Sequence, residues 1–384
     1  MWVKRRHTAA YFVIRSIVRI VSKFKYNFKY EQCKEKGPFL ILGNHSIAHD
    51  PLLYSALFKK KVYFLTADEL LRMGFFSKLV QFFIAPIPKT KSLSDTSSVK
   101  TMLRIAKQKQ NICIFPEGAT TYCGNQSEID PSIAKLAKKI NHPIALVNLE
   151  GGFQSYPKFA KKVRKGKMKA YVKRIITPEE MSLMSVDELY AVIKETLKVP
   201  LVQDAKYRYK RKAEFLETTI YYCSHCDSFD TTTSHKNTFS CTKCGVSYEV
   251  DEQVNLVNEN GKTTISELFH KQEEKINTLS IDDINNAGFN DEVTLTEVIN
   301  YKKVLRAQGT LRLEDGCLVI NEFKFELDKI IGCCTTGSDM VDIYYENLTY
   351  QFRGDKKFCA LKYMNIIYRY GNIANNIDTK FLGK

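Results

Sequence analysis

A histidine and an aspartate five residues apart are the first side chains here that could act together in a reaction. His45 and Asp50 directly follow Phe39–Leu42, an apolar run that predicts a short buried strand. If the chain turns back after this strand, the carboxylate accepts a hydrogen bond from one ring nitrogen and leaves the other as a general base. By itself the spacing is more typical of a structural histidine, and His49 is a second candidate base in the same segment.

A second segment of the same kind changes this interpretation. Asn111–Phe115 is another predicted buried strand, and Pro116-Glu117-Gly118 follows it directly. Asn44-His45 with Asp50, followed farther along by Phe115-Pro116-Glu117-Gly118, resembles the NHxxxxD and FPEG signatures of the lysophosphatidate (1-acylglycerol-3-phosphate) acyltransferases. The resemblance covers about residues 10–200. It implies that His45 deprotonates the acceptor hydroxyl, which attacks an acyl thioester, while Asp50 orients and charges the histidine.

The resemblance also implies residues that bind the acceptor. Asn44, Glu117 and Gly118 match the family's motifs, and Lys89 stands nearest to the position of an arginine that grips the acceptor's phosphate, with Lys91 as a second candidate. A solvated loop lysine is an equally good interpretation of both. Lysine supplies the charge of arginine but not its planar two-point grip on phosphate. The arginine that commonly follows the glycine of FPEG is absent, so the acceptor is either lysophosphatidate or a related alcohol.

Four cysteines form two CxxC pairs separated by 14 residues: Cys223, Cys226, Cys241 and Cys244. Four thiolates at this spacing are typical of a zinc ribbon, in which a tetrahedral Zn²⁺ with four protein ligands has no open position for a substrate. The sequence therefore predicts structural Zn²⁺. Ribbons bind nucleic acid or protein partners or brace a fold, and nothing in these residues decides among those roles.

The charge of the 384-residue chain is unevenly distributed. Residues 1–215 hold 40 lysines and arginines against 17 acidic residues, whereas residues 216–384 hold 18 against 25. The first part should therefore meet an anionic partner, either nucleic acid or a membrane surface with anionic lipids. The ribbon lies in the acidic half, so nucleic-acid binding is disfavoured. Eleven cysteines without a signal peptide indicate a reducing, cytoplasmic compartment.

The first 30 residues predict a basic amphipathic helix. Arg15, Arg19 and Lys23 recur every four residues, while aliphatic and aromatic residues cover the rest of the helix, and no stretch reaches the roughly 20 apolar residues of a spanning helix. Such a helix suits the headgroup layer of a membrane. The alternative is a helix docked on the protein's own core, and both interpretations can hold.

The predicted fold class is α/β, with an acyltransferase-type mixed sheet flanked by helices. The expected segments are the membrane-association helix (1–30), the acyltransferase domain (31–215), the zinc ribbon (216–255) and an α+β C-terminal domain (256–384). In the last segment we expect helices near 264–275 and 291–305, six short strands and a closing helix. That order suggests a small barrel or curved sheet of the pleckstrin-homology type.

The favoured function is transfer of a fatty acyl group from acyl-CoA or acyl carrier protein (acyl-ACP) to 1-acylglycerol 3-phosphate, a lysophospholipid acceptor, giving phosphatidate. One alternative is the same chemistry on glycerol 3-phosphate or another lysophospholipid. Another is a non-enzymatic zinc-ribbon protein that binds a membrane or nucleic acid. We expect a peripheral or monotopic protein on the inner face of the cell membrane, with zinc as its metal.

Overall fold

Two units make up the chain in the computed structural model, which describes residues 4–67, 72, 75–89, 96–299 and 301–383. The first unit is Met1–Pro157 with Lys162–Arg208, and the second is Lys158–Lys161 with Tyr209–Lys384. Each unit has its own sheets and its own buried core. The predicted limits of the four sequence segments stay predictions, because compact units need not follow domain boundaries.

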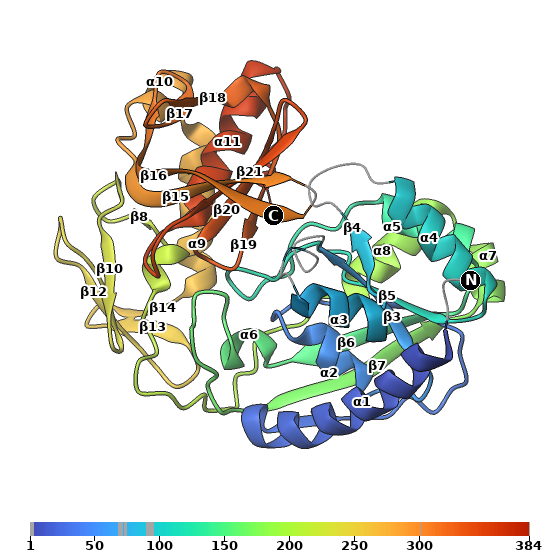
Figure 1. Cartoon of the computed structure of the whole chain (residues 1–384). Coiled ribbons are helices and arrows are strands. Elements are labelled where there is room, and N and C mark those ends of the chain that lie inside the picture. The colour runs from blue at the N-terminus through green and yellow to red at the C-terminus, as the bar shows by residue number, and fades with distance from the viewer. Residues whose placement is uncertain (1–3, 68–71, 73–74, 90–95, 300, 384) are drawn as a thin grey trace. The chain divides into compact units, whose positions relative to one another are not determined.

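A seven-stranded sheet carries the predicted active-site segments in the first unit (Figure 1). The strand order is β1-β7-β6-β2-β5-β3-β4, and every neighbouring pair is parallel except β6 and β7. Its strands are β1 (Phe28–Tyr30), β2 (Leu40–Gly43), β3 (Val62–Ala67), β4 (Ile87–Lys89), β5 (Asn111–Ile114), β6 (Ile144–Glu150) and β7 (Met168–Ile176). Because β2, β5 and β3 run in parallel, their carboxyl ends lie at one edge of the sheet.

Helices cover both faces of this sheet. They are α1 (Arg5–Tyr26), α2 (Asp50–Ser55), α3 (Phe75–Phe83), α4 (Thr96–Lys107), α5 (Ser132–Ile140), α6 (Gly152–Ser155), α7 (Pro178–Leu183) and α8 (Val186–Thr196). One core joins Leu40 and Leu42 of β2 to α4, α5 and α8, and the other joins Ile41 to α1 and α2. Alternate residues of β2 thus enter opposite cores, as expected of a central strand buried on both faces. The predicted α/β class is confirmed.

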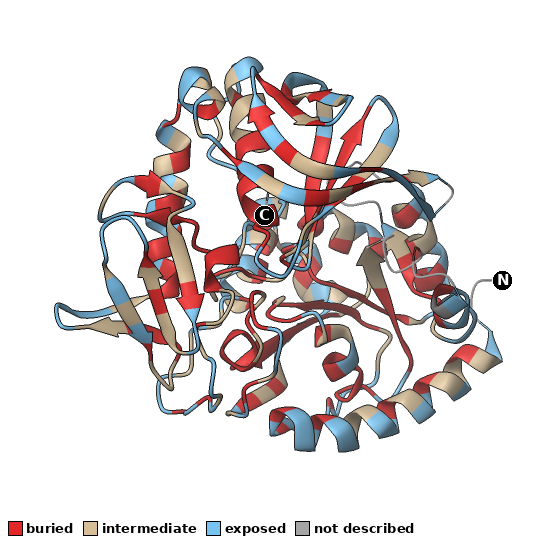
Figure 2. Cartoon of the chain, turned by 60° about the vertical axis from the view of Figure 1, so that its left-hand side comes forward, coloured by how far each residue is buried: buried red, intermediate tan, exposed pale blue. Residues whose placement is uncertain are grey.

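Helix α1 packs with its polar side inward. Its buried residues include His7, Tyr11, Arg15 and Tyr26, and the Tyr11 hydroxyl donates to the carbonyl oxygens of Ser55 at 2.8 Å and Phe58 at 3.0 Å. The large apolar residues Phe12, Val13, Ile17, Ile20, Val21 and Phe24 are exposed instead (Figure 2). Among the described residues, no helix is both long and apolar enough to cross a bilayer. The helix is therefore docked on the domain while its apolar side faces outward.

The second unit contains the cysteine-bearing segment and an antiparallel sheet. The first part has β8 (Tyr222–Cys223) and β9 (Ser228–Phe229), then a five-stranded sheet of β10 (Thr232–His235), β11 (Thr238–Cys241), β12 (Ser247–Val250), β13 (Asn255–Asn258) and β14 (Gly261–Thr264). Helices α9 (Ile265–Thr278) and α10 (Ile281–Asn285) follow, each beginning at a capping box. The expected helix near 264–275 corresponds to α9.

The last part is a seven-stranded antiparallel sheet with the order β18-β17-β16-β15-β21-β20-β19, followed by helix α11 (Ala360–Ala374). Its strands are β15 (Asn290–Ile299), β16 (Lys302–Glu314), β17 (Cys317–Ile320), β18 (Phe323–Glu326), β19 (Ile330–Thr336), β20 (Met340–Tyr345) and β21 (Leu348–Arg353). The expected β-rich domain with a closing helix is confirmed, with seven strands in the sheet where six were predicted, while its pleckstrin-homology type stays a prediction.

The helix expected over 291–305 is wrong, because this segment forms β15 and the start of β16. Val293, Leu295 and Glu297 are buried at alternate positions, which is the period of a strand with one covered face. Glu297 makes the alternation of a strand hard to recognise in the sequence, since its charge suggests an exposed position. In the fold its carboxylate accepts a hydrogen bond from the Arg306 guanidinium at 2.8 Å.

Close packing beneath the end of β2 generates a first prediction. A Cβ atom on Gly43 would lie 2.1 Å from a ring carbon of Tyr54, a fully buried side chain whose hydroxyl donates to the Asn44 carbonyl oxygen at 3.0 Å. We expect Gly43→Ala to lower the free energy of unfolding by about 1–3 kcal/mol because the ring must move. Urea unfolding followed by circular dichroism measures this.

Gly371→Ala is the control, since a Cβ there meets no atom within 4 Å in the helix α11. We expect it to be neutral or to stabilise by about 0.4–1 kcal/mol. Equal unfolding midpoints for the two variants would contradict the packing argument.

Candidate active site

His45 and Asp50 form a hydrogen-bonded pair at the carboxyl end of β2. The ring Nδ1 of His45 lies 2.9 Å from Oδ2 of Asp50. The same carboxylate oxygen accepts the backbone N–H groups of Ser46 at 2.7 Å and Ile47 at 3.0 Å. The chain between the two residues therefore folds back into a tight loop around one oxygen, and α2 begins at Asp50.

The surroundings of Asp50 determine which nitrogen of His45 can act as a base. Burial raises the pKa of the fully buried Asp50 carboxyl, and the hydrogen bonds from His45 and the two amides oppose this rise. An ionised carboxylate only accepts hydrogen bonds, so its partner Nδ1 carries the proton. The lone pair of His45 is then on Nε2, which is the tautomer required of a general base.

Asn44 ties the end of β2 to the end of β6. Its Oδ1 accepts the Leu149 N–H at 2.7 Å, and its Nδ2 donates to the Leu149 carbonyl oxygen at 3.1 Å. The amide thereby continues the parallel β2–β6 pairing by one step after the backbone ladder stops at Gly43 and Val147. These contacts position the residue before His45, and the predicted substrate-binding role of Asn44 stays a prediction.

Glu117 joins the two signature segments. Its Oε1 accepts the His45 N–H at 2.8 Å, and its Oε2 accepts the Ser127 N–H at 2.9 Å. The turn that presents it is closed by the Gly118 N–H, which donates to the Phe115 carbonyl oxygen at 3.0 Å, and Gly118 has φ +73°. Both carboxylate oxygens are thus used to hold backbone, and the acceptor-binding roles predicted for Glu117 and Gly118 stay predictions.

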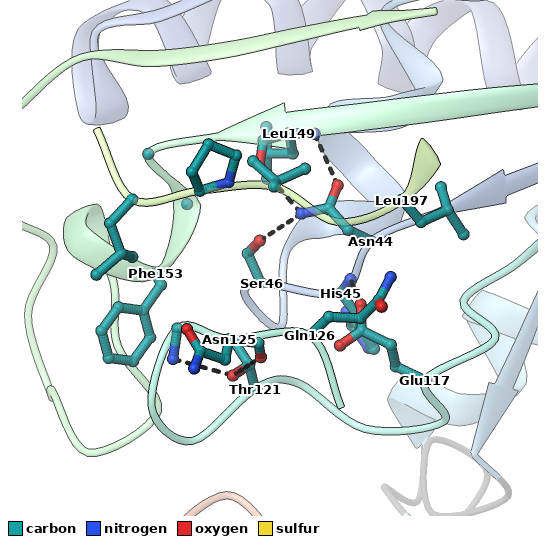
Figure 3. Close-up of a pocket in the computed structure, with 16 residues that line it drawn as sticks. Asn44, His45, Ser46, Glu117, Thr121, Asn125, Gln126, Leu149, Phe153 and Leu197 are labelled. Atoms are coloured by element: carbon teal, nitrogen blue, oxygen red, sulfur yellow. Dashed lines mark hydrogen bonds between the residues drawn. The ribbon is translucent and has the colours of Figure 1, made fainter. Parts of the chain in front are cut away.

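A small pocket of about 20 Å³ lies against these residues (Figure 3). This volume is room for about one water molecule or hydroxyl group. The lining residues come from five segments of the first unit: Asn44, His45, Ser46, Glu117, Thr121, Gly124, Asn125, Gln126, Leu149, Gly151, Gly152, Phe153, Leu197, Val199, Pro200 and Leu201. The imidazole of His45 also stacks on the Phe115 ring, with centroids 4.4 Å apart. The pocket thus places a hydroxyl-sized space beside the candidate base.

Several lining residues had no predicted role. A Cβ atom on Gly152 would lie 2.6 Å from the Cβ of Ser46, so the glycine allows the loop after β6 to approach the histidine loop. Gln154 does not line the pocket but joins two segments that do, because its amide exchanges two hydrogen bonds with the backbone of Val202 at 2.8 and 2.9 Å. The paired glycines after β6 were the available sequence signal for this part of the pocket.

The remaining candidates lie outside the pocket. His49 places its Nδ1 2.8 Å from the Tyr26 hydroxyl and does not line the pocket. Lys89 is exposed at the carboxyl end of β4. That strand is three positions from β2 in the sheet, or about 14 Å at the usual strand spacing. Lys91 lies outside the described residues, so the phosphate-binding roles of Lys89 and Lys91 stay predictions.

The four predicted metal ligands come together in the second unit. All four sulfur atoms of Cys223, Cys226, Cys241 and Cys244 lie within 4.8 Å of one another. Two of the pairs, Cys223 with Cys244 and Cys226 with Cys241, are each 3.7 Å apart. Sulfur atoms at 2.3 Å around a tetrahedral zinc ion are separated by about 3.8 Å, so these two separations match a tetrahedral zinc site.

The burial of Glu117 generates a pH-dependent prediction. Burial raises its pKa from 4.5 to about 7, and the Ser127 and His45 amides oppose the rise. An acid with a higher pKa in the folded state binds more protons when folded. Glu117 should therefore contribute a fall of about 3 kcal/mol in the free energy of unfolding as pH rises from 4.5 to 7. Urea unfolding across this range measures the slope.

Glu117→Gln should remove that contribution to the slope, although it lowers stability at every pH because the amide cannot accept from both backbone groups. The exposed Glu128, changed to glutamine, is the control and should keep the wild-type slope. The same pH dependence in wild type and Glu117→Gln would refute the assignment.

Comparisons with known proteins place this site in a family. The crystal structure of the 1-acyl-sn-glycerophosphate (LPA) acyltransferase PlsC from Thermotoga maritima is similar, with a TM-score of 0.42 and 17% sequence identity, over 49% of this chain and 76% of that chain. No curated protein matches the chain. Residues 25–149 match the family model described as Acyltransferase. The chain therefore contains a domain of the Acyltransferase family, in which both the His45–Asp50 pair and the Glu117 loop lie.

Proposed function

We propose that this protein transfers a fatty acyl group from an acyl thioester to the free hydroxyl of 1-acylglycerol 3-phosphate, producing phosphatidate. The observation that carries the proposal is the His45–Asp50 pair beside a hydroxyl-sized pocket, within the part of the chain that matches the Acyltransferase family.

The proposed reaction uses His45 twice. Its Nε2 removes the proton of the acceptor hydroxyl as the oxygen attacks the thioester carbonyl, and Asp50 stabilises the imidazolium that forms. When the tetrahedral intermediate collapses, the carbon–sulfur bond breaks and His45 returns the proton to the departing thiolate. The products are the ester and a free thiol, and His45 is neutral again.

Both the acyl donor and the acceptor have more than one candidate that fits these residues. Acyl-CoA and acyl carrier protein both present a thioester, so either is a suitable donor. Gly118 is followed by alanine and threonine instead of an arginine that would bind phosphate, and Lys89 at the end of β4 is the candidate substitute on the same sheet edge. Glycerol 3-phosphate and other lysophospholipids are therefore the alternative acceptors.

The proposed working place is a membrane surface with anionic lipids. The exposed apolar residues of α1, including Ile17, Ile20 and Phe24, form a side that can enter the headgroup layer. Lys23 and Lys25 lie in the last turn of the same helix and are available to anionic lipids. A lipid acceptor would then reach the active site from the surface on which it is dissolved.

We also propose that the four-cysteine cluster holds structural Zn²⁺. Cys223 and Cys226 flank the β8–β9 turn, while Cys241 and Cys244 flank the turn between β11 and β12. Zinc would tie these two turns together and would stabilise short strands that have little core of their own. With four protein ligands it takes no part in acyl transfer.

The catalytic proposal predicts the effect of removing the base. His45→Ala should lower the rate of acyl transfer about a hundredfold to ten-thousandfold while leaving the unfolding midpoint near that of wild type. The assay measures labelled acyl-CoA incorporated into 1-acylglycerol 3-phosphate, with glycerol 3-phosphate and acyl carrier protein donors as parallel arms. His49→Ala is the matched control, because this second histidine lies outside the pocket.

Full activity in the folded His45→Ala variant would refute the assigned base. Activity on one acceptor that is lost only in His45→Ala would identify that acceptor. Absence of activity in the wild type with every donor and acceptor would count against the proposed reaction itself.

The zinc proposal predicts a metal-dependent stability. Purified protein should hold about one zinc ion per chain, and Cys244→Ser should lose it and unfold at a lower temperature. Cys244 is exposed, so this change removes a ligand without disturbing packing. Cys33→Ser is the control because Cys33 lies outside the cluster, and it should retain zinc. Wild type without zinc, as measured by atomic emission, would refute the assignment.

A further inference from the structure

A second cleft in the first unit has no role in the proposed reaction. It measures about 670 Å³ and lies between α1 and the loops that lead into β3 and β5. Its lining consists of Thr8, Phe12, Arg15, Arg19, Gln32, Lys59, Lys60, Lys61 and Gln110. Thr8, Phe12, Arg15 and Arg19 follow each other at intervals of four, three and four, so one face of α1 forms one wall.

The cleft lies at the opposite edge of the sheet from His45. Lys61 immediately precedes β3 and Gln110 immediately precedes β5, so both mark the amino ends of parallel strands. His45 and Glu117 instead follow the carboxyl ends of β2 and β5. An acceptor in the active-site pocket therefore does not occupy this cleft.

Positive charge in the cleft is only partly compensated. Five of its lining residues are arginine or lysine, and none of the described residues that line it is acidic. Arg15 is only 9% exposed, and its Nε and Nη2 atoms are buried without a hydrogen-bond partner in the protein. Arg19 uses Nη2 to donate to the Ala56 carbonyl oxygen at 2.9 Å, while its Nε is also buried without a partner.

Burying these cations has a free-energy cost that the fold offsets only in part. Arg19 lies over the Tyr30 ring, and the Lys61 ammonium donates to the Ile84 carbonyl oxygen at 2.7 Å. A buried charge is normally paired with an opposite charge. Burial lowers the pKa of the Arg15 guanidinium and of the Lys61 ammonium, the latter to about 8, and Arg19 further lowers the pKa of Arg15. An anion in the cleft would neutralise this charge, which water cannot do.

We propose that this cleft binds the phosphate monoester headgroup of an anionic phospholipid of the phosphatidate type. Arg15 and Arg19, one helical turn apart, present guanidinium donors that suit phosphate oxygens, and exposed Lys59 and Lys60 add point charges. The inference of a phosphate site depends on these basic residues and not on the proposed membrane role of α1.

The lipid source of the phosphate follows from the position of Phe12. Phe12 lines the cleft, yet it is 48% exposed and belongs to the outward apolar side of α1 with Val13 and Ile17. A lipid can therefore place its phosphate in the cleft while its acyl chains lie along this apolar side. This part of the inference rests on the proposed membrane-facing role of α1, whereas a soluble phosphate would leave the apolar side uncovered.

The first test measures sedimentation with phosphatidylcholine vesicles that contain either phosphatidate or phosphatidylglycerol. Wild type should prefer phosphatidate, and Lys60→Glu should weaken binding to phosphatidate vesicles about tenfold, the loss expected for one charged hydrogen bond. Lys60 is exposed, so this variant should fold. Lys139→Glu is the matched control: it makes the same charge change on the exposed surface of α5, outside the cleft, and should keep the preference.

The second test measures thermal unfolding with inorganic phosphate. Phosphate should raise the midpoint of wild type but not of Arg15→Gln. Without phosphate Arg15→Gln should be at least as stable as wild type, since it removes a buried charge with no partner. A less stable Arg15→Gln with an unchanged phosphate response would mean that Arg15 is structural, and the proposal would fail.

The two tests separate the sources of the anion. A phosphate response that depends on Arg15, together with vesicle binding indifferent to Lys60, would overturn the lipid ligand in favour of a soluble phosphate. No phosphate response and no phosphatidate preference would overturn the site. Neither readout uses acyl transfer, so His45→Ala should bind both phosphate and vesicles like wild type even if the proposed reaction is wrong.

Discussion

The three hydrogen bonds accepted by Oδ2 of Asp50 are the constraint on which the active-site geometry depends. They come from the His45 ring and from the amides of Ser46 and Ile47, so one buried atom fixes both the shape of the loop and the tautomer of the base. Glu117 then attaches the second loop to the His45 amide. Loop shape and base chemistry cannot be separated here, because a change at Asp50 disturbs both.

The sequence predicted the members of this site better than their contacts. Strand, turn and short motif are local features, and they located His45, Asp50 and Glu117 correctly at the ends of β2 and β5. The Asn44 contacts with Leu149 join residues 105 positions apart and depend on the neighbouring places of β2 and β6 in the sheet. No local pattern reports that order. The paired glycines after β6 permit a close approach, but no local pattern identifies its partner, Ser46.

Two expectations illustrate the limits of periodicity. A regular pattern predicted the helix α1, but it could not show which side is buried, and Tyr11 and Arg15 face the core while Phe24 is exposed. The reason is tertiary: the Tyr11 hydroxyl reaches backbone carbonyls beyond α2, which an aliphatic residue could not satisfy. In β15, the buried charge of Glu297 interrupted an otherwise alternating pattern, and the segment was assigned to a helix.

The parallel arrangement of the sheet explains why the active-site pocket and the cationic cleft of the first unit lie at different edges of it. Strand β5 begins after Gln110 of the cleft and leads to Glu117 of the pocket, while β2 ends before His45 and β3 begins after Lys61. A parallel sheet has chemically different edges, because every strand enters at one and leaves at the other. Helix α1 contributes Arg15 and Arg19 to the second edge, while Tyr26 at its end contacts His49 at the first edge. The charge of Arg15 and Arg19 therefore affects ligand binding at the second edge, whereas Asp50 positions His45 at the other edge.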